Sequence, residues 1–135
     1  MTYKIIDIQG IGAAYAEKMI AAGINTVAEL LEKGKTPKGR KELEEATGIT
    51  GKLILTWVNH ADLFRVKGIG PQFSELLEAA GVDTVKELAT RRADNLCAKM
   101  NEVNEAKHLT KVVPTVAQLQ KMIDAAKALP GVVTY

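Results

Sequence analysis

The sequence contains an internal repeat, in which residues 9–30 match residues 67–88 at an offset of 58. Eleven of the 22 aligned positions are identical, including a Gly-Ile-Gly tripeptide, an Ala-Ala-Gly tripeptide and a Thr-Val-x-Glu-Leu segment. Self-similarity at a fixed offset indicates duplication of one structural unit. Further along the match weakens, but an offset of 65 aligns Trp57 with Met122, so each unit is expected to close with a similar helix. We therefore predict two tandem units, at residues 1–62 and 63–135.

Residues that begin and end helices are frequent, and the alternating pattern of strands is nearly absent. Thr26, Thr84 and Thr115 are each followed three residues later by Glu or Gln, which is the pattern of a capping box. Thr36 followed by Pro37 is typical of another helix start. We predict an all-α fold with helices at residues 3–8, 13–22, 27–33, 38–46, 51–65, 71–80, 85–91, 94–106 and 116–129.

The composition is that of an ordinary globular protein, with 135 residues of which 47% are hydrophobic and 25% charged. The net charge is only +2, which is too small to attract nucleic acid or anionic lipid over a long range. Each predicted half carries nine basic and eight acidic side chains, counted over residues 1–66 and 67–135. Any electrostatic attraction must therefore be local.

Several classes of site find no support in the sequence. A single cysteine, Cys97, with His60 and His108 gives no disulfide and no zinc-binding spacing, so we expect no metal. Residues 10–15 lack the third glycine of a dinucleotide fingerprint, and no catalytic constellation is present, so we expect no cofactor and no enzyme. No segment approaches the roughly 20 apolar residues of a membrane span, and we expect a cytoplasmic protein.

The Gly-Ile-Gly tripeptides at residues 10–12 and 68–70 each lie between two predicted helices. Glycine adopts backbone angles that let the chain reverse in a short space, and the central isoleucine can fill the angle between the helices. The helix that follows begins with unpaired N–H groups, which suit a phosphate oxygen. The candidate binding residues of these turns are Gly10, Ile11, Gly12, Ala13, Gly68, Ile69 and Gly70.

These tripeptides and their apolar flanks resemble the helix-hairpin-helix family, found in DNA polymerases, ligases, glycosylases and recombination proteins. The resemblance implies two tandem helix-hairpin-helix (SAM-like) repeats of short helices that grip a nucleic-acid backbone without reading its sequence. The first copy matches the family pattern throughout, and the second departs at Ser74, where a small alanine is usual. Over its whole length the chain is also similar to an uncharacterised bacterial family of tandem hairpin motifs.

Cations are unevenly placed around the two turns. Members that grip DNA often carry Lys or Arg two residues after the second glycine, where this chain has Ala14 and Gln72. Arg65 and Lys67 precede the second tripeptide and are candidate phosphate ligands. A denser basic segment joins two predicted helices and adds Lys38, Gly39, Arg40 and Lys41 to the candidate site, although lysine-rich turns are also often simply solvated.

Two functions remain open on these observations. The first is binding to a DNA or RNA backbone through the turns. The second is a protein-interaction or scaffold module in which the turns serve only as architecture, since a fold does not fix a function. Residues 126–133 also resemble the truncated start of a third hairpin, and an unfinished unit predicts a surface for self-association.

Overall fold

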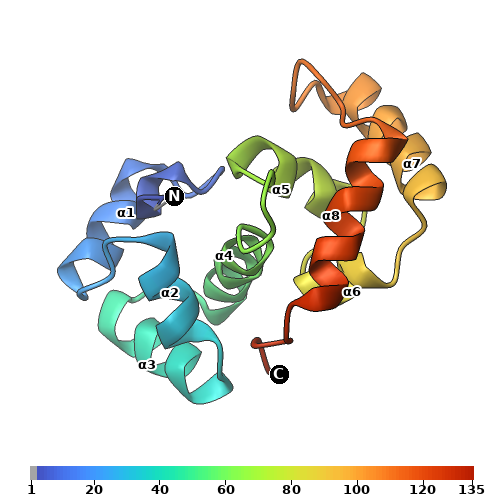
Figure 1. Ribbon diagram of the computed structural model, residues 1–135. Coiled ribbons are helices and arrows are strands. Elements are labelled where there is room, and N and C mark those ends of the chain that lie inside the picture. The colour runs from blue at the N-terminus through green and yellow to red at the C-terminus, as the bar shows by residue number, and fades with distance from the viewer. Residues whose placement is uncertain (1–2) are drawn as a thin grey trace. The chain divides into compact units, whose positions relative to one another are not determined.

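The computed structural model describes residues 3–135 and confirms the all-α prediction. Within this part of the chain no strand forms, and the backbone pairing of Lys4 with Thr26 is an isolated β-bridge. The chain divides into two compact units, one of Met1–Asp62 with Val132–Tyr135 and the other of Leu63–Gly131 (Figure 1). The four final residues thus belong with the first unit.

The first unit consists of one 3₁₀ turn and four α-helices. They are η1 (Ile5–Asp7), α1 (Gly12–Ala21), α2 (Val27–Gly34), α3 (Pro37–Thr47) and α4 (Gly51–Leu63), whose last residue opens the second unit. Helix α1 packs against η1 and α3, and α2 packs against α3. Trp57 of α4 is buried as predicted, and its ring centroid lies 5.2 Å from that of the partly exposed Tyr15.

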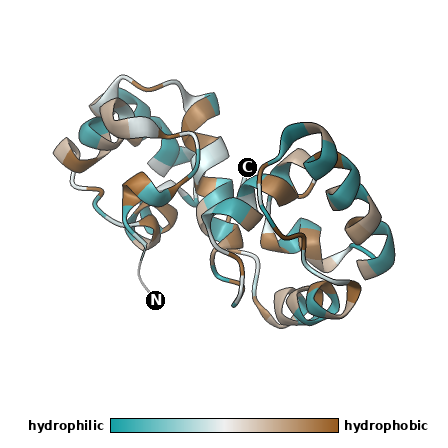
Figure 2. Cartoon of the chain, turned by 90° about the horizontal axis from the view of Figure 1, so that it is seen from above, coloured by the Kyte–Doolittle hydropathy of each residue, from teal (hydrophilic) through white to brown (hydrophobic). Residues whose placement is uncertain are grey.

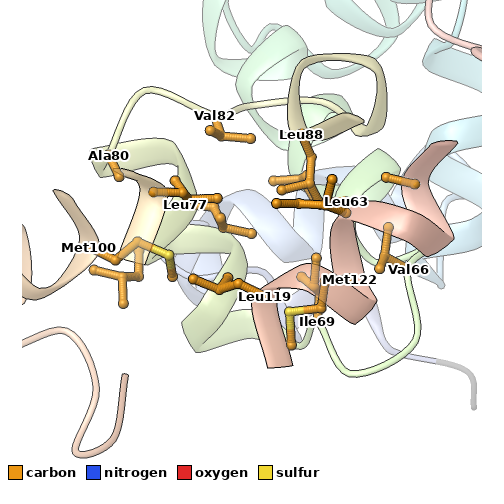
Figure 3. Close-up of a cluster of buried hydrophobic side chains, with 14 of the residues drawn as sticks. Leu63, Val66, Ile69, Leu77, Ala80, Val82, Leu88, Met100, Leu119 and Met122 are labelled. Carbon is orange, nitrogen blue, oxygen red and sulfur yellow. The ribbon is translucent and has the colours of Figure 1, made fainter. Parts of the chain in front are cut away.

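The second unit consists of α5 (Pro71–Ala79), α6 (Val85–Ala89), α7 (Ala93–Lys107) and α8 (Val116–Ala128). Helix α8 packs against α6 and α7, and α5 packs against α7. Leucine, isoleucine, valine and methionine side chains fill the space between these helices (Figure 3). The helices of both units carry hydrophobic as well as hydrophilic residues (Figure 2), as expected of helices that bury one face and expose the other.

The offset of 58 in the sequence is matched by equal backbone hydrogen bonds in the two units. Before the first tripeptide, Ile8 N–H donates to Ile5 O and Ile11 N–H to Ile8 O, both at 3.3 Å. Before the second, the residues 58 positions later make the same two bonds at 3.1 Å, from Val66 to Leu63 and from Ile69 to Val66. All six side chains are buried. The repeated sequence therefore forms the same two backbone hydrogen bonds in each unit, up to the central isoleucine of the tripeptide.

Threonine caps define several of the helix starts. Thr26, Thr36, Thr84 and Thr115 each accept a hydrogen bond from the backbone N–H three residues later. The reciprocal bond of the capping box forms at Thr26 and Thr115. At Thr84 it does not form, and the Glu87 carboxylate accepts from Arg91 Nη2 at 2.5 Å.

One predicted helix is wrong in extent. The sequence predicts a helix over residues 3–8, but the structure has only the single turn Ile5–Asp7. The chain before this turn pairs with residues 25–27, since Ile5 N–H donates to Asn25 O and Val27 N–H donates to Tyr3 O, both at 3.0 Å. These long-range bonds hold the segment extended and limit the helix to one turn.

Candidate functional site

The first turn, residues 10–13, joins η1 to α1 with an exposed backbone. Gly10 and Gly12 have φ angles of +87° and +73°, a region that side chains with a Cβ rarely adopt. Ile11 between them is only 2% exposed, so it fills the angle between the elements as predicted. Gly10, Gly12 and Ala13 are exposed. The turn therefore presents backbone to the surface and hides its one apolar side chain.

The second turn, residues 68–70, has the same plan with one difference. Gly68 has a φ of +94° and Ile69 is 2% exposed. Gly70, however, is extended at φ −110° and ψ −167°, and α5 starts one residue later with Pro71. A Cβ on Gly68 would lie 3.3 Å from Met122 Cε, so α8 closely supports this turn. Figure 3 shows Ile69 beside Met122 in the core beneath it.

Both turns lead into a helix whose first N–H groups have no side-chain cap. The N-cap positions of α1 and α5 are Ile11 and Gly70, neither of which accepts a hydrogen bond through a side chain. Threonines cap α2, α3, α6 and α8, while α7, whose N-cap is Arg92, also has no side-chain cap. The first N–H groups of a helix have no partner within it and carry a partial positive charge. Both turns can thus donate hydrogen bonds to an anion, although α5 has one donor fewer because Pro71 has no N–H.

The two cations before the second turn differ in their surroundings. Lys67 is exposed, directly precedes Gly68, and has no ion-pair partner among the described residues. Arg65 is half-buried, and its Nη2 donates to Pro130 O at 2.6 Å. Arg65 therefore ties the turn to the segment after α8, while Lys67 offers its charge to solvent.

The basic segment at the start of α3 separates into surface and interior residues. Lys38 and Lys41 are exposed, as the sequence predicts for phosphate ligands. Arg40 is 9% exposed, and it donates to Gly34 O at 2.9 Å and to Thr134 O at 2.6 Å. Burial lowers the pKa of Arg40, and the neighbouring Tyr135 opposes this shift. The Arg40 guanidinium thus holds the unit together, away from the surface on which a ligand would lie.

Gly39 is also an interior residue. A Cβ at this position would overlap the backbone carbonyl of Lys33, so glycine allows the start of α3 to approach the end of α2. In Figure 1 the start of α3 lies at the bottom of the first unit and the start of α1 at its top. The structure therefore does not bring the basic segment and the first turn together.

The single cysteine and the two histidines lie in helices or at a helix end, outside both turns. Cys97 is partly buried, with Sγ 3.5 Å from Pro114 O. His60 is buried at 3% exposure, and His108 is the exposed C-cap of α7 with a φ of +53°. Across residues 3–135 no group of three or more His, Cys, Asp or Glu side chains is placed to hold a metal ion. None of the described helices is both long and apolar enough to span a membrane.

A third group of cations was not among the sequence candidates. Arg91, Arg92 and Lys99 line one pocket where α6 ends and α7 begins. The adjacent arginines are visible in the sequence, but Lys99 joins them only because α7 places it two turns further along the same helix. The pocket could therefore be found only from the fold.

Comparison with known proteins identifies a family and gives no activity. No curated protein matches the chain, and neither does any solved structure. One family model matches residues 9–129, a range that includes both turns, the basic segment and all eight α-helices of the described chain. By this match the chain belongs to the family described as Domain of unknown function (DUF4332).

Proposed function

We propose that this protein binds the sugar–phosphate backbone of nucleic acid without reading its sequence, and that its two turns act as helix-hairpin-helix motifs. The observation that carries the proposal is the start of α1 and of α5 behind Gly-Ile-Gly, which no side chain caps and which is exposed at α1 and half-buried at α5. Backbone N–H groups at such a start can bind a phosphate oxygen, and this contact carries no sequence information.

The exposed lysines supply the charge for this interaction. Lys67 stands beside the second turn, and Lys38 and Lys41 form a separate basic surface on the first unit. Gly39 and Arg40 are left out of the proposed contact surface, because both are buried. The second turn, with its adjacent lysine, is the stronger of the two proposed phosphate sites.

An alternative is a protein-binding module in which the turns are only architecture. It is favoured by the first turn, which has Ala14 where a cation would be expected and the exposed carboxylate of Glu17 one helical turn further on. A carboxylate near the helix start repels phosphate. The two functions are separated by whether the chain binds nucleic acid at all.

The test is fluorescence anisotropy of labelled duplex DNA, single-stranded DNA and RNA, titrated at several salt concentrations. The wild type is compared with Lys38→Glu/Lys67→Glu and with a control of equal charge, Lys107→Glu/Lys111→Glu. On duplex DNA, log affinity should fall linearly with log salt by about 0.9 per phosphate neutralised. The first variant should bind more weakly and with a shallower slope, while the control should bind as the wild type does.

Absence of binding at low salt would contradict the proposal and favour a protein partner. Equal weakening in both variants would show that binding depends on total charge and not on these turns. The ratio of affinities for DNA and RNA then identifies the preferred backbone.

A further inference from the structure

A pocket of about 270 Å³ lies in the second unit, outside both turns. It forms where the connection from α6 to α7 meets the first two turns of α7. Its polar walls come from Thr90, Arg91, Arg92, Asn95 and Lys99. The lining thus includes three cations and no carboxylate, an imbalance in a chain whose net charge is only +2.

Two of these cations are held only loosely by their present partners. Arg92 pairs with Asp94 at 3.0 Å, with 76% and 57% of the two side chains exposed. Lys99 lies 3.8 Å from Glu102, again with both side chains mostly exposed. Ion pairs of this kind contribute little because water screens them. An anion in the pocket can therefore compete for both cations.

Arg91 is fixed in place and has a spare donor. Its Nη2 donates to Gly81 O at 3.0 Å and to Glu87 Oε1 at 2.5 Å, so the guanidinium is oriented before any ligand arrives. Its Nε is buried and meets no acceptor among the described residues. Buried donors are almost always hydrogen-bonded, and one without an acceptor is unfavourable. An anion in the pocket would lie against an arginine whose guanidinium is already oriented and whose Nε donor is not used within the protein.

We propose that this pocket binds a terminal phosphate, that is, a phosphate monoester. A monoester carries a charge of about −1.5 to −2 near neutral pH and three acceptor oxygens, which suits three cations and the Asn95 and Thr90 side chains. Ala80 and Leu96 complete the lining with apolar surface, which suits the carbon atoms next to a phosphate. A backbone diester continues on both sides and lies along a surface, whereas an end group can enter a pocket.

The phosphate has two possible sources, a free mononucleotide and the phosphorylated end of a nucleic-acid strand. The proposed binding of a phosphate monoester does not depend on the proposed function of the turns, because none of the pocket cations lies in either turn, whereas the choice of these two sources rests on that function. The two proposals can therefore fail separately.

The test is a heteronuclear NMR titration of the full chain with inorganic phosphate, against sodium chloride at equal ionic strength. Saturable shifts are expected at the Arg91 Nε–H signal and at the amides of residues 90–96.

The variant Arg92→Gln/Lys99→Gln should bind phosphate about tenfold more weakly, since hydrogen bonds to charged groups are lost. The control Lys107→Gln/Lys111→Gln should match the wild type. Both substituted pocket side chains are largely exposed, so the fold should be retained, and circular dichroism checks this.

Two further comparisons identify the source. Adenosine 5′-monophosphate is compared with adenosine, and an oligonucleotide with a 5′-phosphate is compared with its 5′-hydroxyl form. A preference for the phosphorylated member of either pair supports the pocket, and the pair with the larger preference gives the source. Shifts that do not saturate, that chloride reproduces, or that persist unchanged in the pocket variant would overturn the proposal.

Discussion

Individual glycines in this chain have different roles, and the sequence reveals only some of them. Gly10, Gly12 and Gly68 adopt positive φ angles in turns, and the tripeptide pattern predicts such turns directly. Gly39 lies inside helix α3 and is required by its contact with the Lys33 carbonyl of another helix. The burial of Arg40 is equally hidden, because its acceptor on Thr134 is 94 residues away in the sequence. Contacts of that kind require the tertiary fold.

We predict that Gly39→Ala destabilises the protein by about 3 kcal/mol, because the added methyl group forces α2 and α3 apart. Urea unfolding measures the change. The matched control is Gly131→Ala, where a Cβ meets nothing within 4 Å, and its effect should stay within about 0.5 kcal/mol. Equal stability of the two variants would contradict the close approach of the helices.

We predict that the Asp94 carboxyl titrates below the usual pKa of about 3.9. Its pKa is lowered chiefly by the hydrogen bond from Asn95 N–H at 2.8 Å and also by Arg92. Because the folded-state pKa is depressed, the stabilisation is complete above the unfolded pKa and is lost as the pH falls through the folded pKa. An NMR pH titration checks this, and Arg92→Gln should move the pKa of Asp94 upward. A value at or above that of an unfolded chain is the contrary result.

At the scale of elements, the sequence predicts nearly every helix because caps and turn residues act locally. Pro37, Thr115 and the repeated threonines mark helix starts that the structure reproduces within a few residues. The segment at residues 3–8 fails because its backbone bonds to residues 25–27, which no local pattern records. Local sequence signals therefore determine most helices, whereas long-range backbone pairing limits the helix predicted at residues 3–8 to a single turn.

We predict that Thr26→Ala destabilises the first unit by about 1 kcal/mol, through loss of the cap on Glu29 N–H. Glu29→Ala should have a comparable effect, since its carboxylate accepts from the backbone N–H groups of Asn25 and Thr26 at 3.1 and 3.0 Å. Thermal unfolding of both variants measures these losses. The exposed Ala28→Ser is the control on the same helix, and a cap variant no less stable than this control would contradict the assignment.

At the scale of the whole molecule, the chain leaves the first unit after Asp62 and returns to it at Val132. Thr134 N–H donates to Lys35 O at 2.8 Å, its carbonyl accepts from Arg40, and the Tyr135 hydroxyl donates to Asn59 Oδ1 at 3.2 Å. The internal repeat predicts two similar units, but nothing in it predicts that the last residues of the second repeat pack on the first unit. That arrangement depends on bonds between distant positions.

We predict that Arg40→Met destabilises the first unit by about 2 kcal/mol, because two hydrogen bonds from a charged donor are lost. The Thr134 amide should also exchange faster with solvent, because the segment that Arg40 holds is released. Hydrogen exchange followed by NMR measures both effects. Lys41→Met, on the exposed side of the same helix, is the control and should leave the Thr134 amide protected. Equal exchange in the two variants would mean that Arg40 does not hold the segment.

Phosphate binding by the Gly-Ile-Gly turns is tested most directly by NMR mapping of the contact that a short duplex DNA makes on the labelled protein at low salt. If the turns bind phosphate, the largest amide shifts are expected at residues 12–14 and at residues 70, 72 and 73, where α1 and α5 begin without side-chain caps, with further shifts at Lys67. Pro71 has no amide to report. The amides at the threonine-capped starts of α6 and α8 should stay unchanged. Shifts confined to the lysines of α3, or no shifts at all, would contradict the claim that the Gly-Ile-Gly turns bind phosphate.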